Sequence, residues 1–273
     1  MLTRVRHHLS HEILQHRRQL REKMLLCFIV PLIAMTAAKT HGQENKPAPP
    51  RWTYQGEEDP EHWGDLDASF GACKLGRVQS PIDIRNAEKS DLDPVQFNYQ
   101  VSPLKIIDNG HSILATYAPG SFITVGGHQY GLKQFHFHHP SEEKVDGKAF
   151  DMVVHLVHAD ADGKLAVVAV LLKVGSPNAT IRTLWDNLPQ EKNVASTPEN
   201  ITIDAGRLLP ADHGYYTFEG SLTTPPCTEG VVWFVLKSPL SISADELDVF
   251  AKVYPLNARP TQPLNSRIVK ETE

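Results

Sequence analysis

Residues 130–138 have the sequence YGLKQFHFH, in which two histidines alternate with two phenylalanines. In a β-strand, side chains two residues apart point to the same face. His136 and His138 would therefore project together from one face of a strand over 130–138. Phe135 and Phe137 would pack on the opposite face. The segment thus predicts a rigid strand that carries two candidate metal ligands.

Short runs rich in Val, Ile, Tyr and Phe surround this segment, and Gly, Pro, Asn and Asp separate them, a texture typical of β-structure. The dipeptides Asp146-Gly147 and Asp162-Gly163 favour tight turns, so the segments that they join should form antiparallel hairpins. We expect strands over 106–107, 112–117, 122–125, 130–138, 150–158, 165–174 and 230–236.

Helical signals are few, and only 180–187 and 243–254 fit a helix. Ser243 is a candidate N-cap because Glu246 stands three residues later, the pattern of a capping box. The fold class predicted is therefore mainly β (α+β). From Trp52 onward the chain has no internal repeat and no low-complexity break, so residues 52–273 are expected to form a single domain.

The composition is that of an ordinary globular protein and excludes several classes. Of 273 residues, 41% are hydrophobic, 22% are charged and 8% are aromatic, which excludes disordered, collagenous and coiled-coil proteins. The chain has 27 Lys and Arg against 32 Asp and Glu, and its net charge of -5 gives no basis for nucleic-acid binding. No apolar run reaches the ~18 residues that a membrane span requires, so we expect none in the mature chain.

Residues 1–38 have the pattern of a secretory signal peptide. A basic start precedes the apolar stretch Leu25–Ala34, small residues follow, and cleavage is expected near Ala38. Residues 39–51 are rich in proline and should form a flexible linker. The mature protein is therefore predicted to be periplasmic or secreted. The pattern leaves open whether translation starts at Met24 and whether export uses the general or the twin-arginine route.

Cysteine usage supports export. Cys27 lies in the predicted leader, so its removal leaves Cys73 and Cys227 as an even pair in an oxidising compartment. We expect these two cysteines to form a disulfide, and two buried free thiols are the alternative.

A third imidazole would come from the next strand, which contains His155 and His158. If the two strands pair as a hairpin, one of these histidines faces the first two. Three imidazoles leave one position of a tetrahedral metal open, as a catalytic zinc requires, whereas a structural zinc needs a fourth ligand such as Cys. Two alternatives remain. One is a pair of surface histidines, and the other is a cupin-type iron site that includes Glu142 but lacks the second half of that motif.

Four blocks of sequence together carry a resemblance to a known family. They are Gln79-Ser80-Pro81-Ile82, Asn109-Gly110-His111, the segment 134–138, and GSLTTPPC at 220–227. In this order and spacing they closely resemble the alpha-class carbonic anhydrases, with similarity from Trp52 to about Arg267, and the chain looks like an exported bacterial-type member. The resemblance implies a large, twisted, mostly antiparallel central sheet with a few short surface helices. It also implies reversible hydration of carbon dioxide to bicarbonate and a proton.

The resemblance implies a role for the histidines and for one threonine. One zinc ion (Zn2+) would be bound by His136, His138 and His155. Thr223 would donate its hydroxyl proton to Glu142. That hydroxyl could then only accept a hydrogen bond from the attacking hydroxide, which it would orient toward carbon dioxide.

The substrate-binding residues implied by the resemblance combine an apolar wall with two threonines. The wall suits an uncharged substrate, and Thr224 would hold bicarbonate. The full set is Val157, Val167, Leu222, Thr223, Thr224 and Trp233.

Proton transfer and ligand support are implied at further positions. His111 would act as the proton shuttle, because an imidazole exchanges protons near neutral pH, and Tyr54 and Asn109 would order the connecting waters. Gln134 and the backbone carbonyl of Asn257 would accept hydrogen bonds from the first two ligand imidazoles.

Some positions depart from the family pattern, namely Glu143 where a His is usual, Leu114 where an amide is common, Phe218 where Tyr is frequent, and Val153 where the family has Glu. Val153 lies two residues before His155 and so points to the same face. Because valine cannot accept the imidazole N–H, His155 would have to donate to a water, a backbone carbonyl or a carboxylate that the sequence does not identify. Zinc should then dissociate faster than in relatives, and Val153→Glu should slow the loss.

Three function classes follow from these patterns. The first is an enzyme that acts on carbon dioxide and bicarbonate as small-molecule substrates, as a monomer or a homodimer. The second is a non-catalytic binding module, but such relatives lack one or more zinc histidines, and this chain has all three. The third is the cupin-like oxygenase, which would contain iron instead of zinc.

Overall fold

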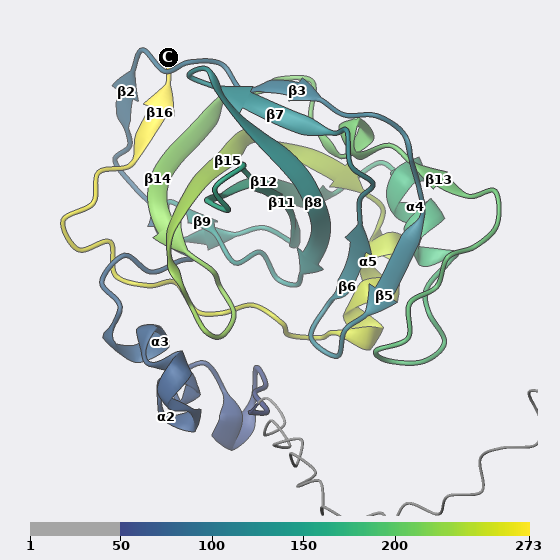
Figure 1. Cartoon of the computed structure of the whole chain (residues 1–273), viewed down its shortest axis with the longest axis horizontal. Coiled ribbons are helices and arrows are strands. Elements are labelled where there is room, and N and C mark those ends of the chain that lie inside the picture. Colours follow the sequence, from purple (N-terminus) through teal and green to yellow (C-terminus); the bar gives the residue numbers. More distant parts are fainter. Residues whose placement is uncertain (1–49) are drawn as a thin grey trace, which may run out of the picture. The chain divides into compact units, whose positions relative to one another are not determined.

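A computed structural model describes residues 50–273 of the chain (Figure 1). The predicted leader over 1–38 and nearly all of the predicted linker over 39–51 lie outside the described residues. Within the described range, no helix is both long enough and apolar enough to cross a membrane.

A central sheet of eleven strands organises the molecule, and Figure 1 shows its strands twisting strongly across the fold. Most neighbouring pairs are antiparallel, which confirms the predicted mainly β class, while the pairs β12–β15 and β16–β2 are parallel. Along the sheet the strands are β2 (Glu88–Ser90), β16 (Lys270–Thr272), β14 (Tyr215–Ser221), β15 (Glu229–Ile242), β12 (Leu165–Val174), β11 (Met152–Ala159), β8 (His128–His138), β6 (Ile113–Thr116) and β5 (Lys105–Asp108). In addition, β7 (Phe122–Val125) pairs with β8 and with β3 (Gln96–Asn98).

Two short sheets and several short helices complete the fold. The first sheet joins β1 (Asp83–Ile84), β9 (Lys144–Val145) and β10 (Lys148–Ala149), and the second joins β4 (Ser102–Pro103) and β13 (Thr202–Ile203). The helices are α2 (Trp63–Leu66), α3 (Ala72–Leu75), α4 (Ala179–Trp185) and α5 (Ala244–Val253), with 3₁₀ turns at Gly56–Glu58, Ala68–Phe70 and Ala205–Leu208.

The sequence predictions agree best where the local pattern is strongest. The strands expected over 122–125 and 165–174 match β7 and β12 residue for residue. The capping box of Ser243 and Glu246 is present at the start of α5. Strand β14 and helices α2 and α3 were not expected, because their segments show neither a clear alternation nor a helical period.

The two predicted hairpins are present, but one of them is built differently from the expectation. Strands β11 and β12 pair antiparallel around Asp162-Gly163, as predicted. Strands β8 and β11 also pair antiparallel. However, Asp146-Gly147 closes the small β9–β10 hairpin inside their connection, since the chain makes a short excursion between the two long strands.

The long strands are buried on both faces, which places the candidate ligands inside the molecule. On β11, Val154 and Leu156 belong to the larger apolar cluster, which also contains the side chains of α4 and α5. Val153 and Val157 point the other way, toward a smaller apolar cluster that includes Trp233. His136 and His138 of β8 and His155 of β11 lie on this second face.

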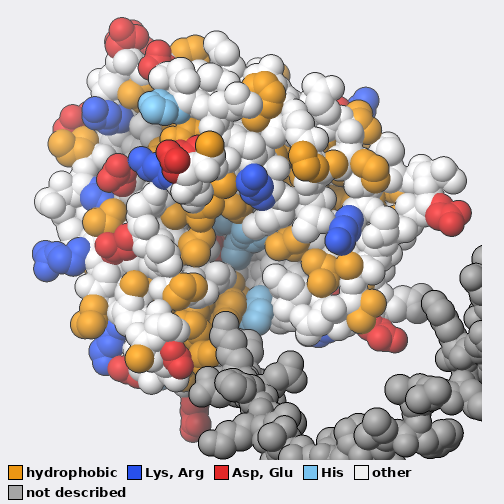
Figure 2. Space-filling view, viewed as in Figure 1, with side chains coloured by type: hydrophobic (Ala, Val, Ile, Leu, Met, Phe, Trp, Pro, Cys, Tyr) orange, Lys and Arg blue, Asp and Glu red, His pale blue; other side chains and the backbone are white. Residues whose placement is uncertain are grey.

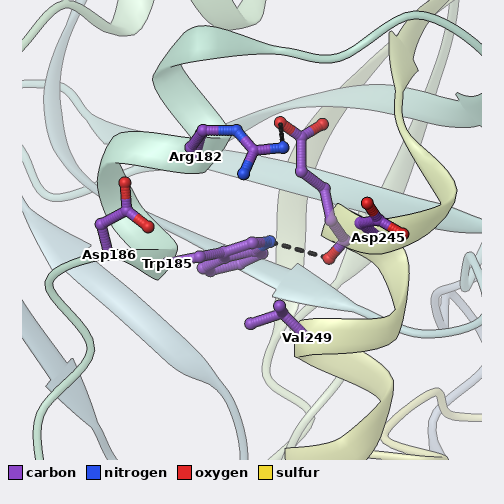
Figure 3. A pocket seen from close by; sticks show the side chains of 6 residues that line it. Arg182, Trp185, Asp186, Asp245 and Val249 are labelled. Atoms are coloured by element: carbon purple, nitrogen blue, oxygen red, sulfur yellow. Dashed lines mark hydrogen bonds and ion pairs between the residues drawn. The ribbon is translucent and has the colours of Figure 1, made fainter.

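A pocket of about 330 Å³ lies between α4 and α5, where the two helices pack against each other (Figure 3). Its buried carboxylate, Glu246, accepts hydrogen bonds from the backbone N–H groups of Asn178 and Ser243 at 3.0 and 2.9 Å. Trp185 Nε1 donates to the Glu246 carbonyl, and Arg182 lies 3.5 Å from the carboxylate. The Glu246 carboxylate and the Trp185 indole N–H are thus occupied in holding the two helices together.

The predicted disulfide is confirmed. Cys73 on α3 is bonded to Cys227, with their Cα atoms 5.0 Å apart and a sequence separation of 154. Cys227 follows Thr223 and Thr224 by a few residues, so the bond ties the N-terminal helices to the loop that carries both threonines.

Replacing both cysteines by serine is expected to lower the free energy of unfolding by up to about 5 kcal/mol, the loop-closure entropy of so long a loop. Urea unfolding of the oxidised parent and of the Cys73→Ser/Cys227→Ser variant measures this difference. Alkylation of the denatured parent without reductant should label neither cysteine. An unchanged unfolding midpoint would show that the bond adds no stability.

Candidate metal centre

Strands β8 and β11 bring three imidazoles together on one face of the sheet. His155 pairs directly with His136, and directly paired residues of neighbouring strands share a face. One nitrogen from each of His136, His138 and His155 lies within 4.8 Å of the others, so this group could hold a metal ion. His158 points to the opposite face, where its Nε2 lies 2.8 Å from the Tyr99 hydroxyl. The strand register therefore selects His155 as the third member.

The second nitrogen of each imidazole faces an acceptor. His136 Nδ1 lies 2.9 Å from Gln134 Oε1, and His138 Nδ1 lies 2.7 Å from the Asn257 carbonyl oxygen. His155 uses its other nitrogen, Nε2, which lies 3.1 and 3.2 Å from the two carboxylate oxygens of Glu143. A ring nitrogen that faces an acceptor holds the proton, so the opposite nitrogen of each ring keeps its lone pair for a metal.

The electrostatic environment keeps the first two imidazoles neutral. Burial lowers the pKa of His136 to about 3 and lowers the pKa of His138 well below its usual value. Burial also opposes the charged form of His155, but the charge and hydrogen bonds of Glu143 outweigh it and raise its pKa. Neutral imidazoles whose outer nitrogens are held by acceptors present an oriented lone pair to a metal ion.

His138 Nε2 supplies the test of whether these residues fit a metal ion. This nitrogen is buried and has no hydrogen-bond partner among residues 50–273. Leaving a buried polar atom unpaired is costly, and a cation between the three lone pairs removes that cost. The donor set therefore fits a metal that accepts three imidazole nitrogens.

The acceptor that the sequence left unidentified is a carboxylate, that of Glu143, so the vacancy inferred beside Val153 is filled. Val153 is fully buried in the smaller apolar cluster, and Glu143 holds the His155 N–H instead. The connection after β8 folds back over the ligand face and carries Glu143 to the ring. The signal was visible, since Glu143 and Val153 both depart from the family pattern, but their proximity follows only from the folded chain.

Glu142, the neighbouring carboxylate, faces the metal centre from the other side. It is 1% exposed, and its Oε1 accepts a hydrogen bond from the backbone N–H of Arg259 at 2.9 Å. Its Oε2 lies 3.5 Å from His138 Nε2 and 3.8 Å from His155 Nδ1. Burial raises the pKa of Glu142 to about 7, against the opposing charge of His155. Its Oε2 has no hydrogen-bond partner among residues 50–273 and lies beside the histidines.

An apolar wall adjoins the histidines. Val157, Val167 and Trp233 are paired in one row across β11, β12 and β15, next to the row that contains His155. The loop after β14 contributes Leu222, Thr223 and Thr224, and together these residues enclose an open pocket of about 410 Å³. The pocket is lined by Gln134, His136, His155, Val157, Val167, Leu222, Thr223, Thr224 and Trp233. Figure 2 shows histidine side chains deep in a central hollow, with hydrophobic side chains around it.

A family model described as eukaryotic-type carbonic anhydrase matches residues 58–273. The chain belongs to this family, the alpha-class carbonic anhydrases. It is accordingly an enzyme of the carbonic anhydrase class, whose members hydrate carbon dioxide.

Named relatives and solved structures agree with this assignment. A carbonic anhydrase of Nostoc sp. is 44% identical over 225 residues, which are 81% of this chain and 85% of the relative. One from Neisseria gonorrhoeae is 41% identical over 246 residues, covering 89% and 95% of the two chains. The structure of the alpha-carbonic anhydrase from Thermovibrio ammonificans with the inhibitor sulfanilamide has a TM-score of 0.78. It is 42% identical and covers 83% of this chain and all of that one.

The turn that carries His111 lies at the edge of this carbonic anhydrase fold, between β5 and β6. Asn109 Oδ1 accepts hydrogen bonds from the backbone N–H groups of His111 and Ser112 at 2.9 and 2.8 Å, so this side chain shapes the turn itself. The His111 ring stacks on Trp52, with centroids 3.6 Å apart, and its Nε2 lies 3.1 Å from the Trp52 carbonyl oxygen. His111 does not itself line the pocket at the ligands.

Two further residues that the sequence predicted for the site, Tyr54 and Asn257, have buried polar groups. The Tyr54 hydroxyl is buried without a hydrogen-bond partner in the described part of the chain, and burial, followed by the charge of Glu142, raises its pKa. The Asn257 side chain donates to the carbonyl oxygens of His111 and Phe137, both at 3.0 Å. Asn257 thereby connects the His111 turn to the strand that bears the first two ligands.

Arg259 is a buried residue that sequence reasoning missed. Its guanidinium donates to Gln79 Oε1, to the Ser80 carbonyl and to the Cys73 carbonyl at 2.9, 2.7 and 3.0 Å. Its backbone N–H holds Glu142. Arg259 therefore gives the Gln79-Ser80 block a structural role, which nothing near Arg259 in the sequence reveals.

Proposed function

We propose that this chain catalyses the reversible hydration of carbon dioxide to bicarbonate and a proton, with one zinc ion held by His136, His138 and His155. The observation that carries the proposal is the arrangement of the three rings. Their outer nitrogens are held by acceptors, and their remaining nitrogens converge beside a partly apolar pocket. Zinc bound there would supply a hydroxide nucleophile at neutral pH, because it lowers the pKa of a coordinated water to about 7.

Thr223 would orient the attack. A hydroxyl that donates its proton to Glu142 has only lone pairs left toward the pocket, so it accepts a hydrogen bond from the nucleophile and directs it. The backbone N–H of Arg259 keeps Glu142 in place for this role. Thr224, which also lines the pocket, would bind the bicarbonate product.

The apolar wall would hold carbon dioxide. The substrate is uncharged and weakly polar, so it needs an apolar surface more than hydrogen-bond donors. Val157, Val167, Leu222 and Trp233 supply this surface beside the histidines.

A pH-indicator assay of carbon dioxide hydration, with and without a zinc-binding sulfonamide, tests the function. We expect rapid acidification that the sulfonamide abolishes, and metal analysis should find one zinc per chain. If zinc-loaded protein acidifies the solution no faster than buffer alone, the result would contradict the proposal and favour the binding module. Iron in place of zinc would favour the cupin-like oxygenase.

His111→Ala is expected to lower turnover in weak buffer by about 10²-fold, the lower end of the usual range for loss of a positioned acid–base group. The change removes a proton relay and leaves the ligands intact, so added imidazole should restore much of the rate. His128→Ala, an exposed histidine at the start of β8, is the matched control and should leave turnover unchanged. Full turnover of His111→Ala in weak buffer would mean that protons leave by another route.

We also propose that the protein is exported to the periplasm or secreted after cleavage near Ala38. The disulfide supports this, since such bonds persist mainly in oxidising compartments. N-terminal sequencing of protein purified from the periplasm or the medium tests the cleavage site. A mature chain that begins at Met1 or Met24 would contradict it.

A further inference from the structure

We propose that Glu143 is a positioning residue for the metal ligand His155, and that in this chain the required carboxylate comes from the β8–β9 connection instead of from β11. The inference rests on the proposed metal centre. It assigns to one side chain the task of orienting His155 Nδ1 toward the ion.

The contact between the two side chains is exclusive and buried. Glu143 is 0% exposed, His155 is 1% exposed, and both carboxylate oxygens lie close to Nε2, at 3.1 and 3.2 Å. Within residues 50–273 the Glu143 carboxylate makes no other hydrogen bond or ion pair. Holding the proton on Nε2 leaves Nδ1 as the nitrogen that can bind metal.

The two carboxylates beside His155 also favour a bound cation. Glu143 lies at one nitrogen of the ring, and Glu142 Oε2 lies 3.8 Å from the other. Two adjacent buried carboxylates repel each other and lose their hydration, which is costly unless positive charge is placed between them. A divalent ion on the three imidazoles supplies that charge, so Glu143 is best explained as part of the metal centre.

The local backbone explains how neighbouring residues reach opposite sides of one ring. Ser141 anchors the connection, because its Oγ accepts from the Phe150 N–H at 2.8 Å and donates to the Glu143 carbonyl at 2.7 Å. The chain bends at Glu142 and Glu143, between the end of β8 and the start of β9. Glu142 can therefore turn toward Thr223 while Glu143 turns toward Nε2.

Val153 stands at the position where the family pattern has a glutamate, so it leaves room for Glu143 to be the only acceptor for His155 within the described residues. It lies on β11 on the same face as His155 and packs, fully buried, in the smaller apolar cluster. With Glu143 in place, a carboxylate at position 153 would be a third buried negative charge. Val153→Glu alone is therefore expected to destabilise the protein and not to slow metal loss, the reverse of the expectation from sequence. Moving the carboxylate from 143 to 153 keeps the charge count unchanged.

The experiment compares metal release from the oxidised, zinc-loaded protein and its variants. Zinc transfer to an excess of strong chelator is followed with a metal-indicator dye, and the visible spectrum of the cobalt-substituted protein reports the ligand geometry. Glu143→Ala should release zinc about 10–100-fold faster and shift the cobalt spectrum. Glu143→Gln should show a smaller effect, since its amide oxygen can still accept from Nε2. Glu143→Ala/Val153→Glu should recover most of the slow release.

Glu246→Gln is the matched control, because this carboxylate is equally buried but joins α4 to α5. It should lower the melting temperature without changing zinc release. Parent-like release from Glu143→Ala overturns the positioning role. If that variant does not fold, parent-like release and a parent-like cobalt spectrum from Glu143→Leu, which keeps much of the side-chain volume but has no acceptor, do the same. A parent protein that binds neither zinc nor cobalt overturns the metal centre itself, which separates failure of the proposed function from failure of this inference.

Discussion

His138→Ala is expected to reduce carbon dioxide hydration by about 10³-fold or more, because the protein loses a ligand and with it the several kcal/mol of charge stabilisation that the metal supplies. His138 is 1% exposed, and its Nε2 has no partner within the described residues, so nothing nearby can replace it. The alanine would also leave a cavity next to two carboxylates. Zinc content by atomic spectroscopy should fall together with the hydration rate.

His158→Gln is the control for that experiment. His158 is buried on the same hairpin but on the opposite face, against Tyr99. Its replacement should lower stability and leave zinc content and hydration close to those of the parent. If His158→Gln lost zinc while His138→Ala kept it, the metal centre would be assigned to the wrong face of the sheet.

Thr223→Val is expected to lower kcat/KM by about 10²–10³-fold while zinc content stays at one per chain. Valine has nearly the volume of threonine, so the pocket keeps its shape and only the hydroxyl is lost. Without it the nucleophile is not directed toward the substrate. Thr217→Val on β14, at a partly exposed strand residue, serves as the matched control and should leave kcat/KM unchanged.

Glu142→Gln, which changes the proposed partner of Thr223, is expected to lower kcat/KM in the same way. An amide at this position can donate to the hydroxyl, which would then be free to donate toward the nucleophile and would misdirect it. Because the two side chains act as a unit, Thr223→Val/Glu142→Gln should be scarcely slower than either single variant. Additive losses in this double-mutant cycle would show that the two residues act independently.

Much of the local structure could be predicted because it depends on neighbours in the chain. The alternation of His136 and His138 with phenylalanines predicted which side chains share a face, and the spacing of Ser243 and Glu246 predicted the start of α5. Two cysteines remaining after the leader allowed one pairing, which the structure contains. These features follow from strand geometry, capping and simple counting, none of which requires knowledge of distant contacts.

The amino-acid sequence alone was sufficient for the class of fold, for two of the ligands and, through its four motif blocks, for the family. Its strand pattern was not sufficient for the choice between His155 and His158, which the family resemblance made and the register of β8 against β11 explains. Nor did it reveal that Glu143 meets His155, or that Arg259 holds Glu142 from 117 residues away. The physical reason is that a strand's alternation is built into its own covalent geometry, whereas hydrogen-bond partners at a buried site are set by which distant segments pack together. That packing exists only when the whole chain has folded.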